Sequence, residues 1–317
     1  MGKIVSRVCI VAMLATTAVV AQRGGGGVAR GGASTGSQPT PLEQLSNRLD
    51  LDKKTQVPVV EQIVTDAARA ALPVAQEMTQ LRRRLLDMEV TGMSADTHPV
   101  LDAHAVAAAK MARMEAQAYR DIFATLKPKQ QSKTPEAFAL MAGILQPATP
   151  MAGRAGRGGG GALFEVSAAP VQRGGGGGGS RGGGGFGGGA TQPSRLDLLT
   201  RAFTLDKTQV KQVKQILDDA YKGAASVCDQ LKVTHAAIGA AIQAGKTPAD
   251  LDELVKAYAV PATAMTRVEM QALAHMLLAL SDSQRANTGA TDTAFLLARA
   301  MFLDDKKWDM APNGRNY

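Results

Sequence analysis

Aromatic side chains are scarce in this chain of 317 residues. Phe, Tyr and Trp together make up 4% of the sequence, whereas Ala, Leu, Val and Met are plentiful. This composition argues against a sheet core rich in aromatic residues. It favours an all-α fold whose helices meet through small apolar side chains.

Cysteine is nearly absent, with only Cys9 and Cys228 in the chain. Cys9 lies in an N-terminal apolar run that we expect to be removed, so no intramolecular disulfide can form. An odd cysteine in an exported protein suggests a free thiol or an intermolecular bridge. We therefore expect Cys228 either to flank a helix interface as a small apolar residue or to link two chains in a self-associated dimer.

Excess charge is also lacking in the parts of the chain that we expect to fold. Residues 42–146 contain 13 basic and 13 acidic side chains, and residues 195–317 contain 15 basic and 14 acidic ones. The net charge of +8 therefore comes almost wholly from the N-terminal 41 residues and the central Gly-rich stretch. Because the folded parts lack a basic surface, nucleic acid is not an expected partner.

Residues 1–21 have the pattern of a secretory signal. Lys3 and Arg7 precede an apolar run from Val8 to Val20, which is too short to cross a bilayer comfortably. The small residues ending at Ala21 form an acceptable cleavage site. We expect a periplasmic or secreted protein with no membrane span after cleavage; an uncleaved anchor is the alternative.

An apolar seam dominates residues 205–244. Apolar residues recur there at alternating steps of three and four, with only Thr234 breaking the series. Such a heptad seam predicts one long helix packed along its length. The seam consists of Val210, Val213, Leu217, Ala220, Ala224, Val227, Leu231, Thr234, Ile238 and Ala241.

The same seam occurs 153 residues earlier, and both copies begin just after a Thr-Gln pair. Two unrelated helices would rarely share phase, length and starting signal, so we interpret the match as an internal duplication. The earlier copy consists of Val57, Val60, Val64, Ala67, Ala71, Val74, Met78, Leu81, Leu85 and Met88.

The predicted organisation is two duplicated modules, each a long antiparallel helical hairpin with short flanking helices. Glycine runs with interspersed arginines predict a disordered linker between them. Helices are expected at 42–49, from a cap at Asp52 or Thr55 to about 91, at 99–125, at 128–145 with a break at Thr134-Pro135, and at 195–203, 206–244, 248–279, from 281 and at 291–302. Kinks are expected at Pro73 and Pro261. The predicted segments are a signal (1–21), a disordered stretch (22–40), module one (41–146), the linker (147–194), module two (195–303) and a polar tail (304–317) in which Trp308 is a candidate anchor.

A Leu-x-x-x-Gln signature precedes several of these helices. The cap side chain accepts from first-turn N–H groups, while the Gln three residues later reaches back to the cap N–H. Alone, this capping box indicates only where a helix begins. The clear copies hold Leu205, Asp206 and Gln209, and Leu280, Ser281 and Gln284; the weaker ones run from Leu126 to Gln130, with Lys in the cap position, and from Leu51 to Gln56, with one extra Lys.

Two such boxes flanking a long helical hairpin, behind a signal peptide, resemble the LTXXQ-motif family of Spy/CpxP type. Members are small all-helical periplasmic proteins, usually one module that dimerises into a curved cradle holding unfolded proteins without ATP. The resemblance implies that the tandem pair here is similar to such a dimer within one chain. The fusion and the long linker depart from the family pattern.

The resemblance favours a non-enzymatic, ATP-independent chaperone or envelope-stress protein whose partners are unfolded or envelope proteins. Adaptable methionines suit such a surface, although the same methionines also suit helix interfaces, and the Arg82-Arg83-Arg84 cluster also suits a solvated face. The alternatives are a self-assembling envelope scaffold and a polyanion binder acting through the Arg-Gly-Gly tracts. The predicted client-binding residues are Met78, Leu81, Arg82, Arg83, Leu85, Met88, Leu231 and Ile238.

No pattern in the sequence indicates catalysis, a metal or a cofactor. The four histidines, His98, His104, His235 and His275, are spaced so that no shared ion is expected. Cys228 has no nearby His to act as its base, so nucleophilic catalysis is not supported. Gly245-Lys246-Thr247 lacks the preceding glycine of a phosphate loop and is interpreted as a helix turn.

Overall fold

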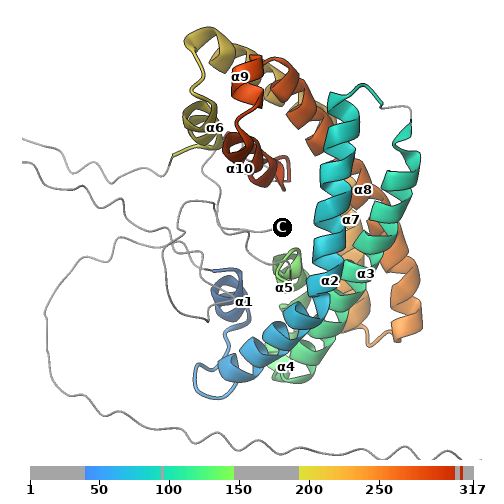
Figure 1. Cartoon of the computed structure of the whole chain (residues 1–317). Helices are drawn as coiled ribbons and strands as arrows, with labels where there is room; N and C mark the ends of the chain where they lie inside the picture. The colour runs from blue at the N-terminus through green and yellow to red at the C-terminus, as the bar shows by residue number, and fades with distance from the viewer. Residues whose placement is uncertain (1–39, 94–95, 146–192, 304–307, 310–317) are drawn as a thin grey trace, which may run out of the picture. The chain divides into compact units, whose positions relative to one another are not determined.

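Four long helices carry most of the molecule. The computed structural model describes residues 40–93, 96–145, 193–303 and 308–309, and all regular structure within these ranges is helical (Figure 1). The predicted all-α fold class is confirmed for this part of the chain. The predicted signal, the stretch from 22 to 39, nearly all of the linker and most of the tail lie outside the described residues.

The first half of the chain contains two long helices between shorter ones. In order, these are α1 (Pro41–Leu49), α2 (Val57–Val90), α3 (His98–Ala124), α4 (Pro128–Gln131), α5 (Thr134–Phe138) and a 3₁₀ turn, η2 (Ala139–Met141). The expected break near Thr134 is present between α4 and α5.

The second half follows a similar plan. It contains α6 (Arg195–Phe203), α7 (Lys207–Gln243), α8 (Pro248–Leu278), α9 (Asp282–Arg285) and α10 (Thr288–Ala298). The last helix begins at Thr288, earlier than predicted, because the Asn287 side chain accepts from the Ala290 N–H and provides the cap. It ends at Ala298, also earlier than predicted.

Local sequence explains where these helices begin and end. Thr40, Ser194, Asp206 and Thr247 each provide the N-cap of a capping box, in which an acidic or Gln side chain three residues later reaches back to the cap N–H. The long helix α7 ends in a Schellman motif around Gly245, whose φ of +68° suits glycine.

Prolines occur inside two of the long helices, where kinks were expected. Both α2 and α8 continue through Pro73 and Pro261 as single helices. In Figure 1 the first part of α2 slants while its second part runs upright. This bend is consistent with the loss of one backbone hydrogen bond at Pro73.

The two apolar seams are buried or partly buried at all twenty positions. Their phase correctly predicted the packed faces of α2 and α7. The helix α8 has a broader buried face, from Leu251 to Leu277, while Lys256, Val260, Arg267 and His275 on its remaining side are exposed. This broad face is in keeping with its packing against three helices, α2, α3 and α7.

Each half contributes to the core of the other. One core combines Leu85, Leu86 and Val100, near the α2–α3 turn, with α6, α8 and α10. The other combines first-half helices with Ile238 and Leu251, near the α7–α8 turn. The two halves therefore pack on each other, an arrangement that the sequence patterns did not specify.

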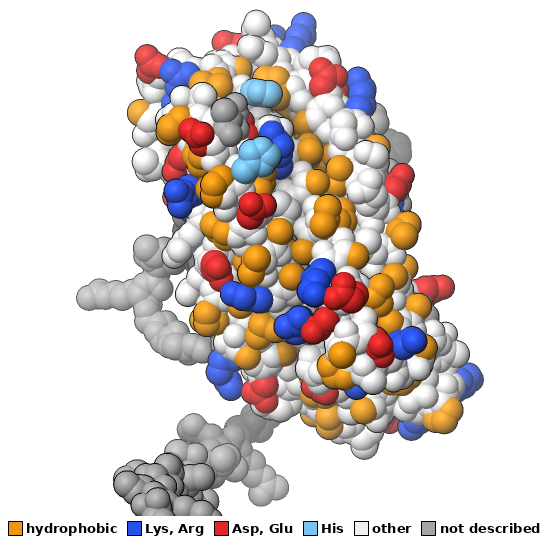
Figure 2. Space-filling model, turned by 90° about the vertical axis from the view of Figure 1, so that its right-hand side faces the viewer, with side chains coloured by type: hydrophobic (Ala, Val, Ile, Leu, Met, Phe, Trp, Pro, Cys, Tyr) orange, Lys and Arg blue, Asp and Glu red, His pale blue; other side chains and the backbone are white. Residues whose placement is uncertain are grey.

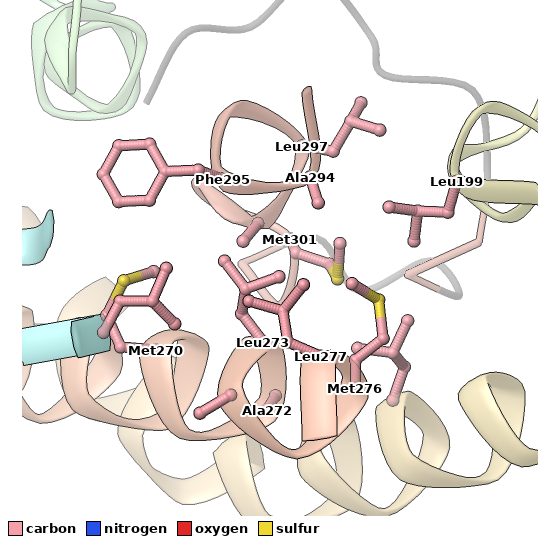
Figure 3. Close-up of a cluster of buried hydrophobic side chains, with 14 of the residues drawn as sticks. Leu199, Met270, Ala272, Leu273, Met276, Leu277, Ala294, Phe295, Leu297 and Met301 are labelled. Carbon is pink, nitrogen blue, oxygen red and sulfur yellow. The ribbon is translucent and has the colours of Figure 1, made fainter. Parts of the chain in front are cut away.

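Figure 3 shows part of the first of these cores. Leu273 and Leu277 of α8 point toward Ala294 and Met301, while Leu199 of α6 approaches from the side. Trp308 is buried in the same core and donates from Nε1 to Asp218 at 2.8 Å. The predicted anchor residue is therefore itself held in the core, while most of the tail lies outside the described residues.

Candidate functional site

The Gln side chains of the repeated signature meet in pairs. In the first half, Gln56 and Gln130 exchange two amide hydrogen bonds of 3.0 and 2.9 Å. Each Oε1 also accepts from a backbone N–H, that of Asp52 for Gln56 and that of Lys127 for Gln130. The pair thus ties the start of α2 to the start of α4.

The second half contains an equivalent pair. Gln209 and Gln284 exchange bonds of 2.8 and 3.0 Å, and their Oε1 atoms accept from the Asp206 and Ser281 N–H groups. In addition, Gln284 Nε2 donates to the Phe203 carbonyl at the end of α6. The capping motif therefore has a tertiary role that local sequence did not reveal.

The two pairs differ in burial and in completeness. Gln56 and Gln130 are buried, whereas Gln209 and Gln284 are partly exposed. Lys127 cannot accept a hydrogen bond through its ammonium group. The box at Leu126–Gln130 therefore keeps only the bond from the Lys127 N–H to Gln130 Oε1. The signature leucines Leu51, Leu126, Leu205 and Leu280 are all buried.

The predicted client-binding residues are distributed between the interior and the surface. Met78, Leu81 and Met88 are partly buried, and Arg83 is exposed. Arg82, Leu85, Leu231 and Ile238 are buried, because they lie where the halves or their hairpins pack. As placed in the structure, these last four side chains offer little surface to a partner.

A cavity of about 110 Å³ lies where three of these residues converge. Met78, Arg82 and Leu231 line it from α2 and α7. The remaining lining comes from α3, α8 and the C-terminal part of the chain: Thr79, His104, Tyr258, Ala262, Met265, Thr266, Glu269, Phe295, Leu296, Arg299, Ala300 and Leu303.

An ion pair crosses between the halves at this cavity. Arg82 Nη1 donates to Glu269 Oε2 at 2.7 Å, and both side chains are almost fully buried. Next to it, Arg83 pairs with Asp292 at 2.9 Å on the surface and lies over the Phe295 ring at 4.7 Å. A buried pair adds little net stability, because desolvation offsets most of its attraction, but removing one partner alone is costly.

His104 extends this polar group. Its Nδ1 lies 3.1 Å from Thr263 Oγ1 and its Nε2 lies 3.3 Å from Thr266 Oγ1. Burial, and then the nearby Arg82, lowers the pKa of His104 to about 4. The imidazole is therefore neutral near pH 7.

Two further ionisable side chains lie nearby. Burial raises the pKa of Glu115 to about 8, although the Gly143 N–H donates to its Oε1 at 2.8 Å. Burial and the charge of Arg82 lower the pKa of Arg299 to about 10. The surroundings of the cavity thus hold two guanidinium groups and two carboxyl groups.

Sequence reasoning missed Glu269, Glu115, Thr266 and Arg299, although a signal was present for the two acids. Glu269 stands four residues after Met265 and four before Leu273, both buried. Glu115 stands likewise between Met111 and Tyr119. A charge at helical spacing within an apolar face is the pattern that could have identified them.

Cys228 and His235 lie in the packed interior. The Cys228 thiol is buried and contacts the Leu303 carbonyl at 3.4 Å, so a disulfide to a second chain would require this contact to open. His235 stacks on Phe138, with ring centroids 4.3 Å apart. It therefore contributes to the packing of α7 against α5.

Within the described residues, no group of three or more His, Cys, Asp or Glu side chains is arranged to hold a metal ion. None of the described helices combines the length and hydropathy needed to cross a membrane. No family model matches the chain, and comparisons with curated proteins and with solved structures gave no match.

Proposed function

We propose that this chain is an exported, non-enzymatic and ATP-independent chaperone or envelope-stress protein that binds unfolded or partner proteins on apolar helix faces. The proposal follows from the resemblance of its signatures to the LTXXQ-motif family. It places the protein in the periplasm or outside the cell. The tandem halves would correspond to the two subunits of a family dimer.

The matched Gln pairs support the idea of an internal duplication. Gln56 and Gln209 are separated by 153 residues, and Gln130 and Gln284 by 154, yet each pair makes the same reciprocal contact. Two unrelated helical segments would rarely share this reciprocal amide contact at the same spacing. A duplicated ancestral hairpin accounts for both pairs.

The observation that carries the functional proposal is the cavity between the halves. Its lining combines the partly exposed Met78 and Leu296 with aromatic and aliphatic walls, beside the exposed Arg83. Flexible apolar side chains next to a cation suit partners of varied sequence. A partner segment would contact this region of α2, α8 and α10.

The face in Figure 2 has a different character. Hydrophobic side chains there are interspersed with acidic and basic ones, which lie side by side. Isolated apolar residues on such a surface are normal for a folded protein. Val233 and Val260 are exposed and absent from the cavity lining, so they are suitable control positions.

The test is light scattering of an aggregating client protein with purified residues 22–317 added and no nucleotide. We expect suppression at near-equimolar ratio. The double variant M78Q/L296Q should lose most of it, while V233Q/V260Q should retain it, with helicity confirmed by circular dichroism. Absence of suppression by the folded parent protein, or equal suppression by both variants, would refute the proposal and favour the scaffold alternative, which size analysis then tests.

A further inference from the structure

A short segment of the first half packs against the second half. It comprises α5, η2 and the turn that follows them, residues 134–145, and its α5 packs on α7. Phe138, Met141 and Leu145 are almost fully buried and share a core with Ile238 and Ile242 of α7. Helical pieces of five and three residues have little stability of their own. The segment therefore stays in place through its tertiary contacts.

A buried histidine is part of this contact. His235 of α7 stacks on Phe138, with ring centroids 4.3 Å apart and 16° between the ring planes, and the Tyr258 ring of α8 lies 5.6 Å away. The Nε2 atom of His235 is buried and has no hydrogen-bond partner among the described residues. Both nitrogens of an imidazolium are donors, so protonation would bury a charged N–H without an acceptor. The Phe138 ring attracts a cation, but it cannot replace the hydrogen bonds of water.

The ionisable groups on the neighbouring elements do not balance such a charge. Burial alone lowers the pKa of His235, to about 4. On α3, burial raises the pKa of Glu115 to about 8, so this group is protonated in acid. Burial also raises the pKa values of Tyr119 on α3 and Tyr258 on α8, which stay neutral. The other charges on the surrounding elements belong to ion pairs that are partly or largely exposed: Arg48–Glu136, Lys133–Asp50, Arg113–Asp252, Lys232–Asp229 and Lys256–Glu253.

We propose that residues 134–145 form an acid-released clasp between the halves, in which protonation of His235 detaches Phe138 and its segment from α7 and exposes the apolar core beneath. Because the pKa of His235 is lowered from 6.5, its contribution to docking is complete above pH 6.5 and is lost as the pH falls toward 4. Glu115, which accepts from the Gly143 N–H at 2.8 Å, stays protonated through this range, so His235 is the trigger. The clasp does not depend on the proposed chaperone function, because it concerns a contact within the chain.

Hydrogen exchange of purified residues 22–317, followed by mass spectrometry of peptides, tests the clasp between pH 6.5 and 4. After correction for the pH dependence of intrinsic exchange, we expect protection of residues 134–145 to fall by up to about tenfold per pH unit and about 100-fold in all. Amides in α3 and α8 should keep their protection, because the opening is local. Unchanged protection of the segment, or an equal loss in every helix, would overturn the proposal.

The variant H235F keeps an aromatic ring against Phe138 and removes the titrating group. It should retain the protection of residues 134–145 at pH 4, whereas H275Q, changed at an exposed histidine, should lose that protection as the parent does. The ion pairs Arg48–Glu136 and Lys133–Asp50 are present in both variants. A loss in H235F equal to that of the parent would therefore assign the effect to other groups and overturn the proposal. If H235F does not fold, H235Q, which is also uncharged at pH 4, provides the same decision.

Discussion

Gln130 and Gln284 show how burial determines the contribution of one side chain to the stability of the fold. Each makes the same reciprocal amide contact, but Gln130 is buried while Gln284 is partly exposed. Truncating Gln130 would remove the donor to the Asp50 carbonyl and both amide bonds to Gln56, whose Nε2 keeps the Thr125 carbonyl alone. A buried polar group left unsatisfied costs more than a lost hydrogen bond that water can replace.

We therefore predict that Gln130→Ala lowers the free energy of unfolding by about 2–3 kcal/mol and Gln284→Ala by about 1 kcal/mol. Urea denaturation followed by circular dichroism measures both. Gln215→Ala is the matched control, because Gln215 is exposed and bonds only Asp219 on its own helix. Equal losses for all three variants would show that the amide pairs contribute no tertiary stability.

Glu115 gives the protein a specific pH dependence. Its pKa is raised from 4.5 to about 8 by burial, so the folded state binds more protons than the unfolded state between these values. Its contribution is complete below pH 4.5 and is lost as the pH rises toward 8. His104 and His235, whose pKa values are lowered to about 4, act in the opposite sense as the pH falls below 6.5.

Glu115→Gln should therefore become more stable relative to the parent as the pH rises from 5 to 8. The gain approaches about 1.4 kcal/mol per pH unit at most. The histidines are common to both proteins and cancel in the difference. Urea midpoints at pH 5, 6.5 and 8 test this, with the exposed Glu61→Gln as control; parallel profiles of Glu115→Gln and the parent would contradict it.

At the scale of the helices, two glycines in or next to α7 should respond in opposite directions. Gly223 lies within the helix, and a Cβ added there meets nothing within 4 Å. Gly245 follows the helix at a φ of +68°, again with open space around it. Space is therefore equal at the two positions, and only the backbone conformation differs.

We predict that Gly223→Ala stabilises the protein by about 0.5–1 kcal/mol, since alanine favours the helix. Gly245→Ala should destabilise it by about 1–2 kcal/mol, because a Cβ is strained in the left-handed region. Thermal unfolding of both variants in one buffer checks the signs. A loss of stability in Gly223→Ala would show that this helix position is constrained by more than its backbone.

Helix positions were largely predictable from the sequence because their causes are local. The capping residues Ser194, Asp206 and Thr247, and Pro248 at the first turn, act within four residues along the chain. The heptad seams likewise predicted the buried faces of α2 and α7. The start of α10 was missed because Asn287, a good cap, was overlooked.

At the scale of the whole molecule, the contacts between the halves could not be predicted. A seam shows which face of a helix is apolar but does not identify the helix that packs against that face. The Arg82–Glu269 and His104–Thr263 contacts, and the cavity beside them, depend on α8 packing against α2 and α3. Four of the predicted client-binding residues are buried because the halves and their hairpins pack together.

Because each core contains residues of both halves, we predict one cooperative unfolding transition. Trp308, the only tryptophan, reports on the core that joins α6, α8 and α10 with the α2–α3 turn. Its fluorescence and the circular dichroism of all helices should change with the same urea midpoint. Separate midpoints would show instead that the halves unfold independently.

The two partners of the ion pair between the halves are synthesised at different times. Arg82 and Glu269 are 187 residues apart in the sequence. At about 5–20 residues per second, a ribosome reaches Glu269 roughly 10–40 s after Arg82. The hairpin of α2 and α3 thus exists on a nascent chain before α8 is made, with Leu85 and Leu86 still lacking their partners from α8 and α10. During this interval we expect the first half of the protein to expose apolar surface, as aggregation-prone folding intermediates do.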